Sequence, residues 1–234
     1  MASGLPQLDR YQALAFDLDG TLYPSLPGLD AQFELSLKKT VKQVTACSEN
    51  DVDRTLGALR RQHRHVVQGL AKLSGLDTTV LLEDIYRRLD LSGIRENPRL
   101  HSTLDALSGG LEILVLTNSS KGHADRVLSL LGLHDIPIQV YGMEEAQFHL
   151  KPDRFVYLNV LSSKKLKASR VLYFDDSQSN IAAARELGVP TVHVREGSIA
   201  GDVADYQAEM DESAWTTSNV EEFLRQSLSS RIGL

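Results

Sequence analysis

Residues 13–21 read Ala-Leu-Ala-Phe-Asp-Leu-Asp-Gly-Thr, and this stretch decides the fold that we expect. Its first four residues are apolar, as in a strand that is buried on both faces of a parallel sheet. Two carboxylates follow at once, Asp17 and Asp19, and Gly20 permits a sharp turn after them. In open α/β sheets the ligand lies beyond the carboxyl ends of the strands, so this stretch predicts a site as well as a strand.

Four further apolar runs predict strands of the same sheet. They cover residues 113–116, 138–141, 171–174 and 191–194. Helical patterns lie between the later runs, among them one from about Gln178 that Gly188-Val189-Pro190 ends. Strands that alternate with helices predict an α/β fold, in which a parallel sheet has helices on both faces.

The segment from about residue 29 to residue 90 shows no strand pattern. Its apolar residues recur at helical spacing in three groups: Phe33, Leu37, Val41 and Val44; Val52, Leu56, Leu59, Val66 and Leu70; Leu82, Ile85 and Leu89. This pattern predicts about three helices, inserted after the first strand. Asn97-Pro98 marks the expected return to the sheet. We therefore expect a small all-helical subdomain over residues 26–95 and a core domain over residues 1–25 and 96–234.

The C-terminal segment, residues 197–234, carries weaker signals. Ser218 and Glu221 have the spacing of a capping box, and they predict a last surface helix that starts there. Trp215 is expected to lie in the core rather than in a site.

Composition excludes several classes of function. The chain has 234 residues and a net charge of −6, which does not fit a nucleic-acid-binding protein. It has one cysteine, Cys47, no apolar run of about 20 residues, and no signal-peptide core at its N-terminus. We therefore expect a cytoplasmic protein that binds neither a nucleic acid polymer nor a membrane. No oligomeric state is predicted.

Polar side chains follow three of the predicted strands. Asp17 and Asp19 follow the first strand, Thr117-Asn118-Ser119 the second, and Asp175-Asp176 the fourth. Carboxylates that are brought together repel one another, and a hard cation with oxygen ligands relieves this repulsion. If the chain acts on phosphate compounds, the cation expected in this place is Mg²⁺. One carboxylate of the Asp17/Asp19 pair can then be a nucleophile, and the other a general acid and base.

Lys151-Pro152-Asp153 precedes a predicted helix that starts near Arg154. In an acidic protein that handles phosphates, a lysine at this place could neutralise the nucleophile and the phosphate. Its significance depends on the other three motifs.

Together these motifs resemble the four motifs of the haloacid dehalogenase superfamily. The matching residues, in chain order, are Asp17-x-Asp19-Gly20-Thr21, Thr117, Lys151-Pro152 and Asp175-Asp176, within about residues 13–194. The resemblance implies a Rossmann-like core, and it implies that the helical insertion is a cap. It makes Asp17 the nucleophile, Asp19 the general acid and base, Thr117 a ligand of the phosphoryl group and Lys151 its clamp.

The resemblance also implies a metal site. Asp17, the main-chain carbonyl of Asp19 and Asp176 would hold Mg²⁺, and Asp175 would reach the ion through water. Asn180 stands where many relatives have an acidic residue, which puts a direct role of that position in doubt.

Asp19 favours a phosphatase over a dehalogenase, because an alkoxide leaving group needs a proton and a halide does not. A closer resemblance is to the pyrimidine 5′-nucleotidase branch, whose first motif usually has asparagine at the place of Gly20. It rests on residues 17–24, Thr117 to Ala124, Tyr141 and residues 174–180. It predicts a pyrimidine nucleotide as substrate, bound also by Asn118, Lys121 and His123.

Other interpretations stay open. The chain could be a phosphatase of another small metabolite, such as phosphoglycolate or a sugar phosphate, a phosphomutase, or a non-catalytic protein that binds a phosphate ligand. The run Arg60-Arg61-Gln62-His63-Arg64-His65 is basic, and His63 falls on an apolar helical stripe between Leu59 and Val66. His63 could therefore be a core residue or could face the substrate.

Overall fold

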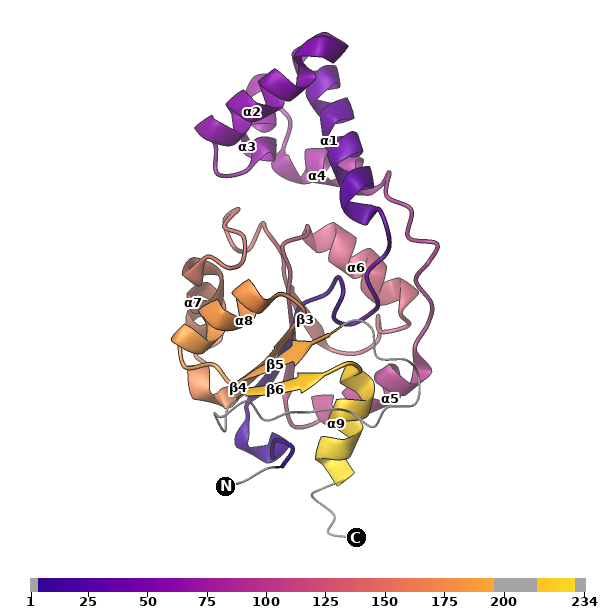
Figure 1. Cartoon of the computed structure of the whole chain (residues 1–234), viewed down its shortest axis with the longest axis vertical. Helices are drawn as coiled ribbons and strands as arrows, with labels where there is room; N and C mark the ends of the chain where they lie inside the picture. Colours follow the sequence, from indigo (N-terminus) through magenta and orange to yellow (C-terminus); the bar gives the residue numbers. More distant parts are fainter. Residues whose placement is uncertain (1–3, 196–213, 230–234) are drawn as a thin grey trace.

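The protein contains a six-stranded parallel sheet with helices on both faces and a group of four helices beyond it, as Figure 1 shows. This computed structural model describes residues 4–195 and 214–229. The α/β class, the helices on both faces and the all-helical cap after the first strand are confirmed. The domain boundaries at residues 25/26 and 95/96 stay predictions.

The order of the strands places the site. It is β3-β2-β1-β4-β5-β6, so successive strands are added on both sides of β1. The strands are β1 Ala13–Phe16, β2 Glu112–Leu116, β3 Ile138–Tyr141, β4 Val171–Asp175, β5 Thr191–Val194 and β6 Ala214–Thr217. Phe16 lies opposite Val115 of β2 and Phe174 of β4. The chain therefore leaves β1, β2 and β4 at nearly the same height, at the point where the strand order reverses and ligands bind in such sheets.

Five of the six strands were predicted, and β6 was not. Its residues Ala-Trp-Thr-Thr have too little apolar character to stand out from a loop. Pairing with β5 forms this strand, which buries Trp215 as expected.

Two layers of helices cover the sheet. Side chains alternate across each strand, so Leu14 and Phe16 pack with one layer, and Ala13 and Ala15 pack with the other. The first layer contains α5 Pro98–Ser108, α6 Lys121–Leu130 and α9 Val220–Ser229, and the second contains α7 Arg154–Ser163 and α8 Gln178–Glu186. Short 3₁₀ helices are η1 Leu8–Arg10, η2 Glu49–Asp51 and η3 Ala168–Arg170.

The cap has four α-helices rather than three. They are α1 Leu29–Thr45, α2 Val52–Gln62, α3 Val66–Ser74 and α4 Thr78–Tyr86. The helix predicted from Val52 to Leu70 is divided into α2 and α3, because the backbone is extended at His63 and His65. His65 then caps α3: its Nδ1 accepts a hydrogen bond from the Val67 amide at 3.3 Å, and its own amide donates to Gln68 Oε1 at 3.1 Å. This reciprocal capping starts a new helix where the periodicity alone continued the old one.

The predicted cap of the last helix was wrong by one residue. Asn219, not Ser218, caps the start of α9, because Asn219 Oδ1 accepts the Glu222 amide at 3.1 Å. Its main-chain carbonyl accepts the first helical bond, from Phe223. Much of the remaining C-terminal segment lies outside the described residues.

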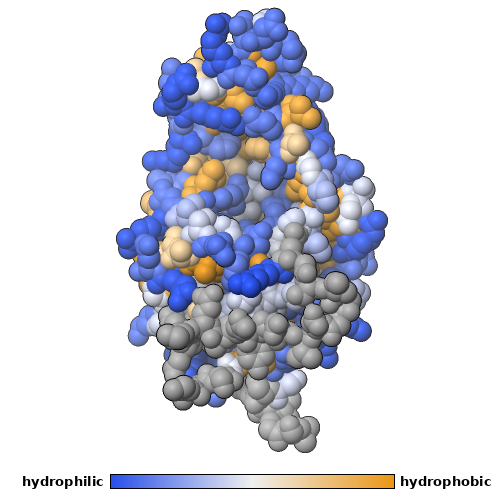
Figure 2. All heavy atoms as spheres, viewed as in Figure 1, coloured by the Kyte–Doolittle hydropathy of each residue, from blue (hydrophilic) through white to orange (hydrophobic). Residues whose placement is uncertain are grey.

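Hydrophilic side chains cover most of the face that Figure 2 shows, and hydrophobic ones gather where that face is hollowed below the cap. Within residues 4–195 and 214–229, no helix is long and apolar enough to cross a bilayer.

Candidate active site

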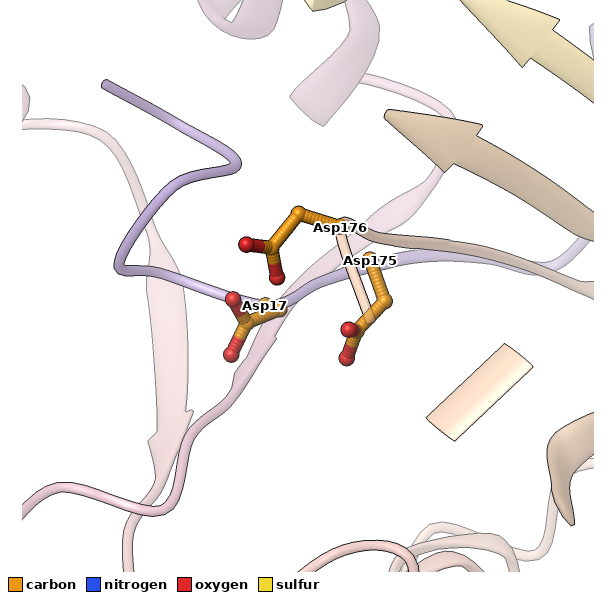
Figure 3. Close-up of side chains that lie close together, drawn as sticks. All are labelled: Asp17, Asp175 and Asp176. Atoms are coloured by element: carbon orange, nitrogen blue, oxygen red, sulfur yellow. The ribbon is translucent and has the colours of Figure 1, made fainter. Parts of the chain in front are cut away.

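Three carboxylates meet at the carboxyl ends of two neighbouring strands. Asp17 follows β1, Asp175 ends β4 and Asp176 comes next, and oxygens of all three lie within 4.8 Å of one another. Figure 3 shows the three groups together. This closeness follows from the pairing of Phe16 with Phe174, which brings the next residues of both strands side by side.

Lys151 binds two of these carboxylates from the loop before α7. Its buried Nζ donates to Asp17 Oδ1 at 2.6 Å and to Asp175 Oδ2 at 2.9 Å. It also donates to the Leu116 carbonyl at 2.7 Å and contacts the Tyr173 hydroxyl at 3.0 Å. Burial lowers the pKa of Lys151, but the charges of Asp17 and Asp175 outweigh burial and leave that pKa raised. Lys151 is therefore a fixed cation next to Asp17.

Asp17 is buried, and the nearby charge of Lys151 does not offset the effect of this burial on its carboxylate. Burial raises the pKa of Asp17 to about 7, with the charge of Asp175 adding to the rise and that of Lys151 opposing it. Its Oδ2 accepts a hydrogen bond from Thr21 Oγ1 at 3.2 Å. A divalent cation would supply the missing positive charge, and a set of carboxylate oxygens is what Mg²⁺ prefers.

Gly20 shows that the main chain after Asp19 passes very close to Asp176. A Cβ at Gly20 would lie 2.6 Å from Asp176 Oδ2, and the φ of Gly20 is +84°. The chain segment that carries the Asp19 carbonyl is therefore next to the Asp176 carboxylate, which fits the expected ligand set of Asp17, the Asp19 carbonyl and Asp176.

Asp175 differs from the other two because protein donors surround it. Its Oδ1 accepts the Ser177 amide at 2.8 Å and Asn180 Nδ2 at 3.0 Å, while its Oδ2 accepts Lys151 and the Tyr173 hydroxyl. With both oxygens occupied in this way, Asp175 holds Lys151 in place and is the least suited of the three to bind a metal directly. Asn180 donates here, which an acidic residue could not do.

Asp19 is held by three side chains. Ser119 Oγ donates to Asp19 Oδ2 at 2.9 Å, the Tyr23 hydroxyl donates to Oδ1, and His123 Nε2 lies 3.5 Å from Oδ1. Burial raises the pKa of Asp19, but the hydrogen bond and charge of His123, together with the bonds from Tyr23 and Ser119, outweigh burial and lower it. The protein thus fixes this carboxylate beside Asp17.

The loop after β2 brings Thr117 and Asn118 to the same site. Thr117 is buried, and its Oγ1 accepts the Ser119 amide at 3.0 Å. Asn118 pairs with the main chain of Lys151 through both ends of its amide, at 2.7 Å and 3.0 Å. Asn118 therefore connects the loop after β2 to the loop that carries Lys151.

The two further predicted substrate ligands behave differently. His123 is buried and lines the cavity beside Asp19. Lys121 is exposed at the start of α6, does not line the cavity, and donates its main-chain amide to Glu144. The structure brings His123 to the other site residues and does not bring Lys121.

A cavity of about 560 Å³ lies between cap and core. It is lined by Asp17, Asp19, Thr117, Asn118, His123, Lys151 and Asp176, and on the cap side by Leu29, Asp30, Phe33, His65, Tyr86 and Leu89, among others. Of the basic run, His65 lines this cavity, whereas His63 packs against Gly69 inside the cap.

Sequence reasoning assigned no site role to five residues that the structure places there: Tyr23, His65, Tyr86, Ser119 and Tyr173. Tyr173 had a usable signal, because strand alternation puts it on the same face as Asp175. The others contact the site through tertiary packing or loop geometry, which no periodicity records.

Three comparisons place the chain among known proteins. The sequence profile of the family described as haloacid dehalogenase-like hydrolase matches residues 14–194. The chain is 31% identical over 209 residues to a phosphoglycolate phosphatase of Rhodospirillum rubrum, which covers 84% of this chain and 85% of that protein. It is 27% identical over 210 residues to one of Pectobacterium atrosepticum, which covers 86% and 87%.

Among solved structures, a 2-haloacid dehalogenase of Pseudomonas syringae pv. Tomato has the same fold, with a TM-score of 0.58 and 19% identity over 94% of this chain and 99% of that one. The names of the two curated relatives give no support to the pyrimidine 5′-nucleotidase branch expected from the sequence.

Proposed function

The chain belongs to the haloacid dehalogenase-like hydrolase family, and on this basis we propose that it is a Mg²⁺-dependent phosphatase of small phosphate monoesters. One observation carries the proposal: Lys151 Nζ lies 2.6 Å from Asp17 Oδ1, in a group of carboxylates within 4.8 Å of one another. A buried lysine and a cation-binding carboxylate group on the same aspartate suit a nucleophile that attacks a phosphate dianion.

In the first step Asp17 attacks the phosphorus atom and forms an aspartyl-phosphate, while the bond from phosphorus to the alcohol oxygen breaks. Asp19 gives its proton to that oxygen. The phosphate dianion favours the required protonated form, because a negative charge next to Asp19 raises its pKa. Lys151 and Thr117 hold the phosphoryl oxygens.

In the second step water attacks the phosphorus atom, and Asp19 takes a proton from that water. The bond between phosphorus and Asp17 breaks, so inorganic phosphate leaves and Asp17 is restored. Mg²⁺ bound by Asp17, the Asp19 carbonyl and Asp176 would supply positive charge that offsets the charges of nucleophile and phosphate.

Asp19 distinguishes this activity from dehalogenation, because an alkoxide needs the proton that Asp19 can give. The likeness to a dehalogenase at 19% identity concerns the fold alone. Phosphoglycolate is the first substrate to try, because the curated relatives carry that name. Pyrimidine nucleotides, expected from the residues after Thr117, are the second.

The test is a panel of phosphate esters with and without Mg²⁺, and with a chelator in excess. We expect phosphate release that stops on chelation and returns with Mg²⁺, and a phospho-enzyme on Asp17 after acid quenching. Full activity in excess chelator would overturn the metal assignment. Release of no phosphate from any ester would overturn the function.

A further inference from the structure

The cavity has two ends of different chemistry. At one end are the charged groups around Asp17. At the other, six apolar or aromatic side chains form a surface that we call the apolar wall: Leu29, Phe33, Tyr86 and Leu89 from the cap, and Met143 and Leu150 from the core. Tyr86, Leu89 and Met143 are buried, which makes the wall part of the packed core.

Aromatic contacts connect this wall to the proposed general acid. The ring centroids of Phe33 and Tyr86 lie 5.1 Å apart, and those of Tyr86 and His123 lie 4.7 Å apart. His123 in turn contacts Asp19, at 3.5 Å. Since Asp19 must reach the departing oxygen, the group attached to that oxygen lies next to Tyr86 and the rest of the wall.

The wall carries no permanent positive charge. Among the described residues that line the cavity, Lys151 is the one Lys or Arg, and it is bound to Asp17 and Asp175. Of the basic run in the cap, Arg60 pairs with Glu34 at 2.8 Å and Arg64 contacts the Gln147 carbonyl at 3.4 Å. Neither arginine lines the cavity.

The remaining titratable groups do not favour a second anion either. Asp19 and Asp30 both line the cavity, and Asp30 is exposed. His65 accepts a hydrogen bond at Nδ1, and burial, helped by the charge of Arg60, lowers its pKa to about 4, so this ring is neutral near pH 7. His123 also lines the cavity, and its Nε2 faces Asp19 Oδ1 at 3.5 Å. A carboxylate on the alcohol part would leave water for carboxylates and apolar groups, and the basic groups nearest to it, Lys151 and His123, already contact carboxylates.

We propose that the alcohol part of the natural substrate is uncharged and largely apolar, and that it binds against the apolar wall. A carboxylate next to the ester, as in phosphoglycolate, is selected against. The size of the cavity agrees, because about 560 Å³ lies within the range of sites that enclose ligands much larger than phosphoglycolate. This inference rests on the proposed phosphatase function and narrows its substrate class.

A matched pair of esters tests the charge. Phosphoglycolate and its neutral amide have almost the same size and differ by one negative charge, and benzyl phosphate adds an apolar ring. We expect kcat/KM with Mg²⁺ to rise from phosphoglycolate to the amide by about tenfold or more, and to be highest for benzyl phosphate. A kcat/KM for phosphoglycolate equal to or above that of the amide overturns the inference and leaves the phosphatase function intact.

Variants test two features of the cavity: the apolar wall, through Phe33, and the negative charge of Asp30. Phe33→Ala should lower kcat/KM for benzyl phosphate by about tenfold, with little change for phosphoglycolate. Leu35→Ala is the control, because Leu35 lies on the same helix and is 67% exposed. Asp30→Asn should reduce the difference in kcat/KM between phosphoglycolate and its amide. Asp105→Asn, an exposed substitution on α5, is the control and should leave that difference unchanged. Equal effects of Phe33→Ala on both esters would contradict the assigned wall.

Binding gives a readout that does not need turnover. Calorimetry with the Mg²⁺-loaded protein would compare benzylphosphonate with phosphonoacetate, neither of which can be hydrolysed. We expect the tighter Kd for benzylphosphonate, and a reversed order overturns the inference. If no ester were hydrolysed, the proposed function would fail, while this comparison would still decide what the cavity prefers.

Discussion

At the scale of single residues, each acidic side chain of the site has a different set of partners. Asp17 faces Lys151 and Thr21, Asp175 is surrounded by donors, and Asp19 is held by Tyr23, Ser119 and His123. The partners of each carboxylate, rather than its residue type, therefore distinguish the roles that we propose: Asp17 as nucleophile, Asp175 as a positioning group and Asp19 as general acid and base. Substitutions at these positions should impair different steps of the reaction.

We predict that Asp17→Asn loses hydrolysis of every ester, because the amide cannot form the aspartyl-phosphate. Asp19→Asn should slow phospho-enzyme formation from an alkyl ester by about 10² to 10⁴. The effect on nitrophenyl phosphate should be much smaller, because nitrophenolate leaves without a proton. Rapid mixing measures the first burst for both esters. Equal losses would mean that Asp19 is not the general acid.

We predict that Gly20→Ala weakens the apparent affinity for Mg²⁺ by about 10- to 100-fold, as disturbances next to metal ligands do. Its Cβ would lie 2.6 Å from Asp176 Oδ2. Gly28→Ala is the control, because its φ of +80° gives the same backbone strain and its Cβ meets nothing within 4 Å. Metal titrations of both variants compare them. If both lost the same affinity, strain and not the contact with Asp176 would be the cause.

At the scale of elements, the fold of the cap depends on where its helices begin. The interruption between α2 and α3 places His65 at a helix start, where its Nδ1 is a capping acceptor, and at the same time on the cavity. One residue therefore fixes the fold of α3 and part of the binding surface.

We predict that the protein becomes less stable as the pH is lowered, partly because His65 takes up a proton more readily in the unfolded state. Its pKa is lowered to about 4 by burial, against 6.5 for an unfolded histidine, so the unfolded state binds a proton first as the pH drops. This contribution is fully present above pH 6.5 and is lost as the pH falls toward 4; at pH 5 the loss is about 2 kcal/mol.

The measurement is the free energy of unfolding in urea at pH 7.5 and pH 5, for the natural protein and for His65→Asn. Asparagine keeps a capping oxygen but does not titrate. The free energy of unfolding should change less between pH 7.5 and pH 5 in the variant than in the natural protein. An identical difference in both proteins would exclude His65 as a source.

At the scale of the whole molecule, cap and core share one cavity and one hydrophobic core. Buried residues of α1 to α4 belong to the same cluster as those of β1, α5 and α6. Polar contacts also cross between the two parts; in one of them Arg126 of α6 donates to the Tyr86 carbonyl of α4, at 3.1 Å. This contact connects Tyr86 to α6, the helix that also carries His123 beside Asp19.

We predict that Arg126→Ala raises KM by about two- to tenfold, the size of one hydrogen bond, and changes kcat less. The reason is that Arg126 touches no reacting group but positions the wall. Arg99→Ala, an exposed change on α5, is the control. Steady-state kinetics with benzyl phosphate gives both constants. A fall in kcat with unchanged KM would contradict a positioning role.

The sequence by itself determined the sheet, the cap insertion and the grouping of Asp17, Thr117, Lys151 and Asp175-Asp176. It could do so because most of these residues directly follow a strand, and parallel strands end at a common edge. It also indicated the chemistry, because adjacent carboxylates require a cation or a shifted pKa.

Tertiary structure alone decided the rest. Pairing with β5 made β6 a strand, and capping at His65 divided a helical pattern that looked continuous. The partners of Asp19, the exposure of Lys121 and the apolar wall depend on contacts between segments far apart in the chain. Local periodicity reports which face of an element is buried, but not which distant side chain lies against that face, and substrate choice depends on the latter.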